Sequence, residues 1–291
     1  MTTLILGATG NVGVHVVDSL IARGEPTRII TRDRENARRV LPDSVDIIEG
    51  DMGEEKVLLG ALDDVDAVFL LTPHSYTMAD LQLQIIRMLR RSSVKIVKLS
   101  ATSSGIRPDG PFTLRQHWEI EQVLTATGQN FVILRPNGFM QTLVAAQMLP
   151  SVIESQSILN SSGSARLSMI DARDIGEVAA RVLTSDTWDG QTLVLTGPRA
   201  VTFNEIAALI GEARGEYIRA IDVTPADVRA SLLSRGVEGW EAGHIQEMHQ
   251  LFRDGGSEEV TGDVQKVLEK SPRTIENFVR ENFAYVGTPT P

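Results

Sequence analysis

The stretch Leu4-Ile-Leu-Gly-Ala-Thr-Gly-Asn-Val-Gly13 decides how the rest of the chain is interpreted. It begins with an apolar run that is typical of a buried strand, and three glycines follow at positions 7, 10 and 13. Directly after the first two glycines, apolar side chains recur at helical spacing between Val12 and Leu20. The pattern predicts a strand, a tight turn and a helix that begins at the turn.

A turn of this kind is suited to holding a diphosphate. The N–H groups at a helix N-terminus have no partner within the helix, and the helix dipole adds a partial positive charge there. Gly7 permits the tight turn, Gly10 lets the backbone approach the anion, and Gly13 allows the helix to pack closely on the strand. The alternative, a glycine-rich turn without a ligand, is disfavoured by the strand–turn–helix context. The predicted dinucleotide site comprises Gly7, Thr9, Gly10, Asn11, Val12 and Gly13.

The end of the second predicted strand, Thr27–Thr31, indicates which dinucleotide fits. Proteins that bind NAD place a carboxylate there for the ribose 2′-hydroxyl, whereas arginine accommodates the 2′-phosphate of NADP. Here Thr31 occupies the usual acidic position, and Arg32 and Arg34 follow it. Asp33, about 20 residues beyond the turn, argues for NAD, and Arg32 has the alternative of being a solvated loop cation. We predict that NADP(H) is preferred, that NAD(H) is possible, and that Arg32 holds the 2′-phosphate.

Short apolar strands alternate with helical patterns from residue 2 to about residue 135. This alternation is typical of a parallel sheet that helices cover on both faces. We predict an α/β fold with a doubly wound parallel sheet (Rossmann fold) in residues 1–150, completed by about residues 166–196. A smaller C-terminal substrate lobe is expected mostly within residues 151–291. Residues 151–164 read as a polar loop, and residues 287–291 as a frayed tail.

Composition and charge exclude several classes of protein. The chain has 28 Lys+Arg against 38 Asp+Glu, a net charge of −10, and no cysteine. A chain this acidic is not expected to bind nucleic acid or an anionic membrane, and without cysteine it has neither disulfides nor thiolate metal sites. No apolar run approaches the ~18 residues that a membrane span needs. We expect a cytoplasmic protein with a small-molecule partner; nothing in the sequence indicates an oligomeric state.

Further motifs follow the glycine turn in a fixed order: Thr31-Arg32, Gly50-Asp51, Leu71-Thr-Pro73, Leu134-Arg-Pro-Asn-Gly-Phe-Met140 and Asp171-Ala-Arg-Asp174. Together they resemble the NmrA-like branch of the atypical short-chain dehydrogenases. That branch includes quinone oxidoreductases, triphenylmethane reductase and ergot-alkaloid dehydrogenases. The resemblance covers about residues 2–223 and weakens in the C-terminal helices.

The resemblance implies roles for residues that follow the predicted strands. Asp51 would hydrogen-bond the adenine amino group, and Met52 would lie against the adenine ring. Asn137 and Phe139 would border the substrate cleft. The residues implied on the nicotinamide side are Leu71, Thr72, Pro73, Ser100 and Ala101. Without the resemblance, Asp51 and Thr72 would be interpreted as ordinary turn or cap residues.

The helix predicted after the fifth strand departs from the catalytic pattern of ordinary short-chain dehydrogenases. Short-chain dehydrogenases carry a Tyr-x-x-x-Lys pair there, and this chain has His117 and Glu121 at that spacing. Both fall on one helical face. His117 is therefore the candidate proton donor, with His74 and Tyr76 as further candidates beside the substrate.

Two functions stay open at this point. The first is a reductase whose apolar conjugated acceptor, a quinone, an enone, or an imine or iminium ion, takes a hydride with little acid catalysis. The second is a non-catalytic regulatory protein that binds NADP and reports the redox state. A metal site is not predicted, because His244 and His249 are five residues apart and zinc sites on helices use a spacing of four.

Overall fold

The computed structural model describes residues 1–90 and 92–284 and divides the chain into two compact units. Unit 1 comprises Met1–Pro136, Ala172–Leu195 and Asp263–Lys270, and unit 2 comprises Asn137–Asp171, Thr196–Gly262 and Ser271–Pro291. The predicted first domain ran to residue 150, whereas in the structure residues 137–150 belong to unit 2. The predicted tail at 287–291 lies outside the described residues.

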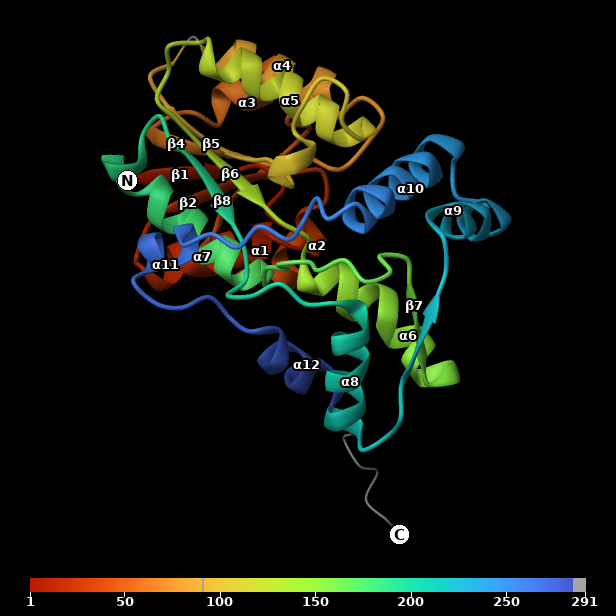
Figure 1. Cartoon of the computed structure of the whole chain (residues 1–291). Coiled ribbons are helices and arrows are strands. Elements are labelled where there is room, and N and C mark those ends of the chain that lie inside the picture. The colour runs from red at the N-terminus through yellow and green to blue at the C-terminus, as the bar shows by residue number, and fades with distance from the viewer. Residues whose placement is uncertain (91, 285–291) are drawn as a thin grey trace. The chain divides into compact units, whose positions relative to one another are not determined.

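Unit 1 is built on a seven-stranded parallel sheet (Figure 1). Its strands are β1 (Thr2–Ile5), β2 (Thr27–Thr31), β3 (Asp46–Glu49), β4 (Val65–Leu70), β5 (Lys95–Leu99), β6 (Phe131–Pro136) and β8 (Thr192–Leu195). They lie in the order β3-β2-β1-β4-β5-β6-β8, so the winding direction switches between β1 and β4. The predicted doubly wound α/β fold is confirmed, and ligands of such sheets bind beyond the carboxyl ends of the strands at the switch point.

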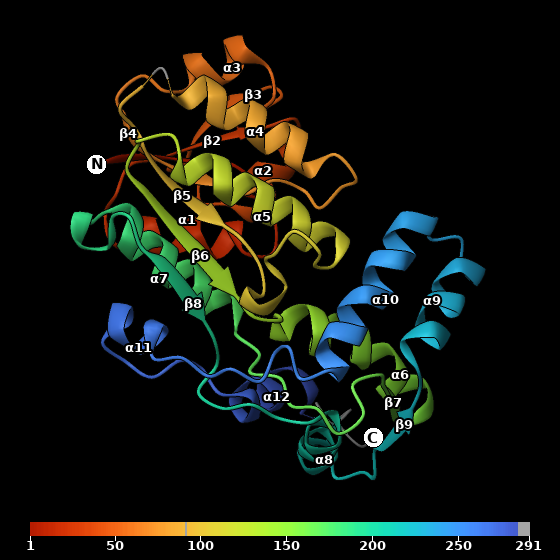
Figure 2. The ribbon, with the colours of Figure 1, turned by 45° about the horizontal axis from the view of Figure 1, so that its top comes forward.

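Helices cover both faces of this sheet (Figure 2). They are α1 (Gly13–Ala22), α2 (Arg34–Val40), α3 (Glu55–Gly60), α4 (Met78–Leu89), α5 (Phe112–Thr125), α7 (Ala172–Leu183) and α11 (Asp263–Leu268). On one face α1 packs against α7, with α11 beside α7, and α3, α4 and α5 lie on the other face. The central strands are therefore apolar on both faces, and Leu4, Val68 and Val97 are fully buried.

Unit 2 has a second apolar core. A π-helical segment, Gln141–Ala146, continues into α6 (Gln147–Ser155), and β7 (Ser157–Asn160) pairs in parallel with β9 (Arg219–Asp222). The prediction of a loop over residues 151–164 was therefore wrong for residues 151–155, which belong to α6, and for residues 157–160, which form β7. Val152 and Ile158 are buried in the core, and this packing outweighs the polar local sequence. The remaining helices are α8 (Phe203–Arg214), α9 (Pro225–Ser234), α10 (Gly239–Arg253) and α12 (Ile275–Phe283).

No helix among the described residues is both long enough and apolar enough to span a membrane.

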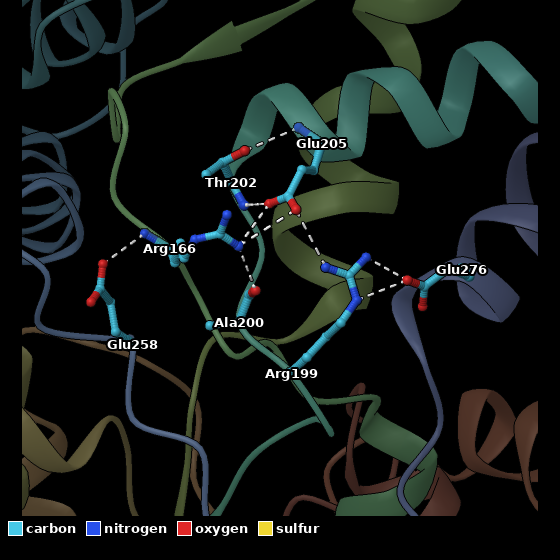
Figure 3. Close-up of polar contacts among 7 residues, drawn as sticks. All are labelled: Arg166, Arg199, Ala200, Thr202, Glu205, Glu258 and Glu276. Carbon is cyan, nitrogen blue, oxygen red and sulfur yellow. Dashed lines mark hydrogen bonds and ion pairs between the residues drawn. The ribbon is translucent and has the colours of Figure 1, made fainter.

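A network of charged side chains holds the start of α8 in unit 2 (Figure 3). Thr202 and Glu205 form a capping box, in which each side chain accepts a hydrogen bond from the backbone N–H of the other residue. The Glu205 carboxylate also pairs with Arg166 at 3.1 Å and with Arg199 at 3.6 Å, and Arg199 pairs with Glu276 of α12. The backbone hydrogen bond from Thr202, with smaller help from the arginines, lowers the pKa of Glu205 below its ordinary value.

We expect Glu205→Gln to destabilise the protein at neutral pH and to remove part of its sensitivity to acid. A lowered folded-state pKa stabilises the fold above the unfolded pKa of ~4.3, and this contribution is lost as the pH falls through the folded value. Because the side chain is 38% exposed, the loss at pH 7 should be only about 0.5–1 kcal/mol. Urea unfolding at pH 7 and pH 3 measures it. The control is Glu212→Gln on the exposed face of α8; a Glu205→Gln effect equal at both pH values would contradict the expectation.

Candidate nucleotide-binding and catalytic site

The glycine turn connects β1 to α1 with almost no space between the two backbones. Gly7 has a φ of 73°, and its carbonyl accepts a hydrogen bond from the Gly10 N–H at 3.1 Å. A Cβ at Gly13 would lie 2.1 Å from the same carbonyl oxygen, so the helix can begin there only without a side chain. A Cβ at Gly10 would meet that oxygen at 3.3 Å, a far milder contact. Internal packing therefore explains Gly7 and Gly13, and the close approach of a ligand is the stronger reason for Gly10.

The start of α1 offers hydrogen-bond donors without partners. In the described part of the chain, the backbone N–H groups of Asn11, Val12 and Gly13 have no acceptor. The N-cap residue, Val12, has no polar side chain to satisfy them, and the first turn of α1 holds no acidic residue. An anion placed here would accept these hydrogen bonds and would meet the positive end of the helix dipole. The turn therefore fits the diphosphate of a dinucleotide.

The charged residues after β2 differ in how they are held. Arg32 is exposed, and its nearest carboxylate is that of Asp51 at 3.9 Å. Arg34 is paired with Glu49 at 3.2 Å, and Asp33 uses its carboxylate to cap α2. Arg32 can therefore still turn toward a phosphate, whereas Arg34 is held by Glu49. The Asp33 carboxylate, which favoured NAD in the sequence, is already hydrogen-bonded to the start of α2.

Other predicted cofactor residues lie at the carboxyl edge of the sheet. Asp51 follows β3 and accepts a hydrogen bond from the Gly53 N–H at 2.8 Å, which is ordinary turn chemistry. Thr72 follows β4, is buried, and accepts a hydrogen bond from Gln82 Nε2 at 2.9 Å. Their contacts with adenine and nicotinamide ribose stay predictions. The remaining predicted residues follow the same strands: Met52 after β3, Leu71 and Pro73 after β4, and Ser100 and Ala101 after β5.

The candidate proton donor lies against a buried lysine. His117 of α5 is 8% exposed, and its Nδ1 lies 2.9 Å from Lys98 Nζ of β5. Lys98 also donates a hydrogen bond to the Leu99 carbonyl at 3.0 Å. Complete burial lowers the pKa of Lys98 from its ordinary 10.5 to about 7, because burial disfavours the charged form; nearby Glu121 opposes this shift and Arg135 adds to it.

Glu121, one helical turn after His117, is engaged in an ion pair. Its Oε2 lies 2.5 Å from Arg135 Nη2 of β6, and its Oε1 accepts a hydrogen bond from Ser100 Oγ, also at 2.5 Å. The carboxylate therefore fixes Ser100 at the end of β5. His117 and Ser100 were candidates from the sequence, whereas Lys98 and Arg135, which contact His117 and Glu121, were not. The available signal for Lys98 was a second lysine, after Lys95, in a central strand that is apolar at its other positions.

Two predicted substrate residues of unit 1 lie against the start of α5. His74 Nδ1 is 3.4 Å from Thr113 Oγ1, and exposed Tyr76 stacks on Phe112 with ring centroids 5.1 Å apart. The structure therefore brings His74 and Tyr76 to the helix that carries His117.

The other two predicted substrate residues belong to unit 2. Asn137 is buried, and its Nδ2 donates hydrogen bonds to Ser168 Oγ at 2.8 Å and to the Ser257 carbonyl at 2.9 Å. Phe139 forms a parallel bridge with Ile170. The amide of Asn137 thus has a structural role within unit 2, and its role beside the substrate, like that of Phe139, stays a prediction.

One of the two histidines of α10, His249, is held inside unit 2. His249 is buried, its Nδ1 is hydrogen-bonded with Ser161 Oγ, and burial lowers its pKa to about 4. Residues 1–90 and 92–284 contain no group of three or more histidine, aspartate or glutamate side chains placed to hold a metal ion.

Residues 1–279 match the NmrA-like family, so the chain belongs to this family, as its motifs indicated. It is 29% identical over 285 residues to an NAD(P)H azoreductase of Xenophilus azovorans, covering 98% of this chain and 99% of the relative. Two solved structures share the fold. An NADPH-dependent quinone oxidoreductase of Escherichia coli has a TM-score of 0.86 at 22% identity, covering 96% of this chain and 99% of that one. A triphenylmethane reductase of Citrobacter sp. has a TM-score of 0.86 at 21% identity, covering 97% and 99%.

We expect Gly13→Ala to destabilise the protein strongly and to weaken dinucleotide binding. The new Cβ must push the start of α1 away from the Gly7 carbonyl, and overpacking of this kind costs about 1–3 kcal/mol or more. Gly60→Ala in α3 is the control, because nothing lies within 4 Å of its Cβ position. Thermal unfolding and nucleotide titration of both variants measure the effect. Equal stability of the two variants would contradict the assigned role of Gly13.

Lys98 should make the free energy of unfolding of the wild type rise with pH above about pH 7, and we expect Lys98→Met to remove this rise. Between about pH 7 and 10.5 the unfolded chain binds more protons at Lys98 than the folded chain does, so the contribution of Lys98 to stability rises across this window. Below pH 7 the buried lysine carries its full penalty. The free energy of unfolding of Lys98→Met should therefore exceed that of wild type by the largest amount at pH 6–7. Above pH 7 this difference should decrease by up to ~1.4 kcal/mol per pH unit.

Urea unfolding at four pH values between 6 and 9 provides the measurement. Lys95→Met on the same strand is the control, since the Lys95 ammonium is paired with Asp189 and its removal should lower stability. A difference between wild type and Lys98→Met that is independent of pH would show that Lys98 keeps an ordinary pKa.

Proposed function

We propose that the protein is an NADPH-dependent oxidoreductase that reduces an apolar conjugated acceptor, such as a quinone, an enone, or an imine or iminium ion. The observation that carries the proposal is the glycine turn, whose backbone N–H groups at Asn11, Val12 and Gly13 have no acceptor within the described chain. Bound NADPH would supply the hydride. Membership in the NmrA-like family supports the proposal, because its relatives include an azoreductase and a quinone oxidoreductase.

The residues around the turn have separate roles in this proposal. The turn grips the diphosphate, and Arg32 pairs with the 2′-phosphate. Asp51 accepts a hydrogen bond from the adenine amino group, with Met52 beside the ring. Thr72 and Ser100 border the nicotinamide, and both hydroxyls are already fixed by Gln82 and Glu121, so they present one orientation to the cofactor.

The residues of α5 support the proposed class of acceptor. A phenol–lysine pair would serve a carbonyl that needs strong acid catalysis, and α5 has His117 and the ion-paired Glu121 at that spacing. A conjugated, electron-poor acceptor takes a hydride with less assistance, so positioning of the acceptor and proton donation by an imidazole fit this chemistry. The names of the relatives, which refer to azo, quinone and triphenylmethane compounds, denote conjugated acceptors of this kind.

One experiment separates the proposed enzyme from a redox sensor. The protein is incubated with NADPH and, in turn, with quinones, enones, imines and azo dyes, while the nicotinamide absorbance is followed. Oxidation of NADPH that requires both protein and acceptor supports the proposal. Binding of NADPH without oxidation across the whole panel overturns it in favour of a sensor.

We expect Arg32→Ala to weaken NADPH binding by ~1–3 kcal/mol, or roughly 5- to 150-fold, because a charged hydrogen bond to the 2′-phosphate is lost. NADH lacks this phosphate, so its affinity should change by less than about twofold. Calorimetric titration of both cofactors measures the two affinities. Arg34→Ala is the matched control, since Glu49 already holds that guanidinium. Equal losses for NADPH and NADH in Arg32→Ala would remove the argument that Arg32 selects NADP.

A further inference from the structure

Lys98 is a buried cation whose surroundings lack a partner of opposite charge in direct contact. Its two hydrogen-bond partners among the described residues are the Leu99 carbonyl and His117 Nδ1, and no carboxylate lies within ion-pair distance. Burying an ammonium in this way is unfavourable, and groups that carry such a penalty are concentrated at functional sites. Lys98 also lies near the carboxyl end of β5, the edge at which ligands of this fold bind.

The contact between these two side chains determines the state of the histidine. An ammonium has only hydrogens to donate, so His117 Nδ1 must accept. In a neutral imidazole the ring hydrogen is then on Nε2. Lys98 therefore selects the tautomer of His117 in which Nε2 carries the proton.

We propose that Lys98 and His117 form a proton relay in which Lys98 recharges His117, the group that protonates the reduced acceptor. The relay rests on the proposed function and adds to it the source of the proton that completes the reduction after hydride transfer. In ordinary short-chain dehydrogenases the lysine of the Tyr-x-x-x-Lys pair lies on the helix after the fifth strand, whereas Lys98 lies on β5 itself.

In the relay two protons move together, one at each ring nitrogen of His117. After hydride addition to a neutral acceptor, such as a quinone, an enone or an imine, the product carries a negative charge on its heteroatom; an iminium ion becomes a neutral amine and does not use the relay. The His117 Nε2–H bond breaks and its proton neutralises this anion, while a proton from the Lys98 ammonium forms a new bond to Nδ1. His117 ends neutral in its other tautomer, and Lys98 ends as a neutral amine. A proton from solvent then adds to Nε2 while the Nδ1 proton returns to the Lys98 amine, so both residues regain their starting states.

The local charges suit this role. The charged groups that face Lys98 are Glu121 of α5 and Arg135 of β6, which act in opposite directions, with His117 in contact. Since burial lowers the pKa of Lys98 to about 7, the ammonium can release a proton and regain it near neutral pH. An ordinary lysine would hold its proton too tightly to recharge an imidazole.

The first test uses nuclear magnetic resonance and needs no activity. Wild-type protein with ¹⁵N-labelled histidine should show His117 with a protonated Nε2 and an unprotonated, hydrogen-bond-accepting Nδ1. In Lys98→Met this tautomer preference should be lost. Finding the proton on Nδ1 in the wild type at pH 6, where Lys98 is charged, would overturn the relay.

The second test separates proton transfer from positioning. Lys98→Arg keeps a cationic donor beside Nδ1, but arginine does not release a proton, so the tautomer should persist while kcat falls. General acid catalysis contributes about 10²–10⁴-fold, so we expect at least a tenfold loss of kcat in both Lys98→Arg and Lys98→Met, with KM changed by less than about threefold. In the wild type, kcat should fall as the pH rises above about 7, and this dependence should be absent from both variants.

Matched variants complete the design. His117→Asn should lose about as much kcat as Lys98→Met, and the double variant should lose no more, because the two residues act in series. Lys95→Met tests for the general effect of losing a buried lysine from β5, and its pH profile should match that of wild type. Full activity in Lys98→Arg or Lys98→Met overturns the relay alone. A wild type that fails to oxidise NADPH with any acceptor of the panel overturns the proposed function instead.

Discussion

The fold of unit 1 and its candidate site both depend on one backbone contact, in which the start of α1 lies directly against the Gly7 carbonyl. A Cβ at position 13 would be 2.1 Å from that oxygen, so the contact requires glycine at position 13. It places α1 immediately after β1, next to the switch point of the sheet, and leaves donors at Asn11, Val12 and Gly13 without acceptors. The same constraint that packs the helix on the strand therefore creates a place for an anion.

A second group of interactions stabilises the neighbouring part of the sheet edge. On one side of α5 the Glu121 carboxylate joins Arg135 and Ser100, and one turn earlier His117 contacts Lys98. The first cluster is ion-paired and rigid, because each charge has a partner. The second holds a cation that burial makes easy to deprotonate. On the same helix, Glu121 is therefore held by a fully charged partner, Arg135, whereas His117 contacts a lysine that burial makes easy to deprotonate. Only the contact of His117 with Lys98 is suited to moving a proton.

Local sequence was sufficient to predict the parallel sheet of unit 1, but neither the place of α11 in that unit nor the elements at the start of unit 2. Strands such as Ala67–Leu71 and the helix from Val12 to Leu20 have apolar patterns that follow from burial on two faces or on one, and the parallel sheet could be derived from them. Residues 151–164 have no such pattern, because the helix and strand there are stabilised by distant partners in the core of unit 2. Lys98 was missed for a related reason: a strand pattern shows that a residue is buried, but not which helix residue it faces.

The division of the chain also has a consequence for how the protein is made. Unit 1 takes its last strand, β8, from residues 192–195 and its last helix, α11, from residues 263–268. Until the ribosome has released β8, the strand β6 has an unpaired edge, and such an edge invites pairing with other nascent chains. A fragment cut after residue 150 would have every residue of the glycine turn and still lack β8, the edge strand beside β6, and the helices α7 and α11. The first 150 residues therefore contain only part of unit 1.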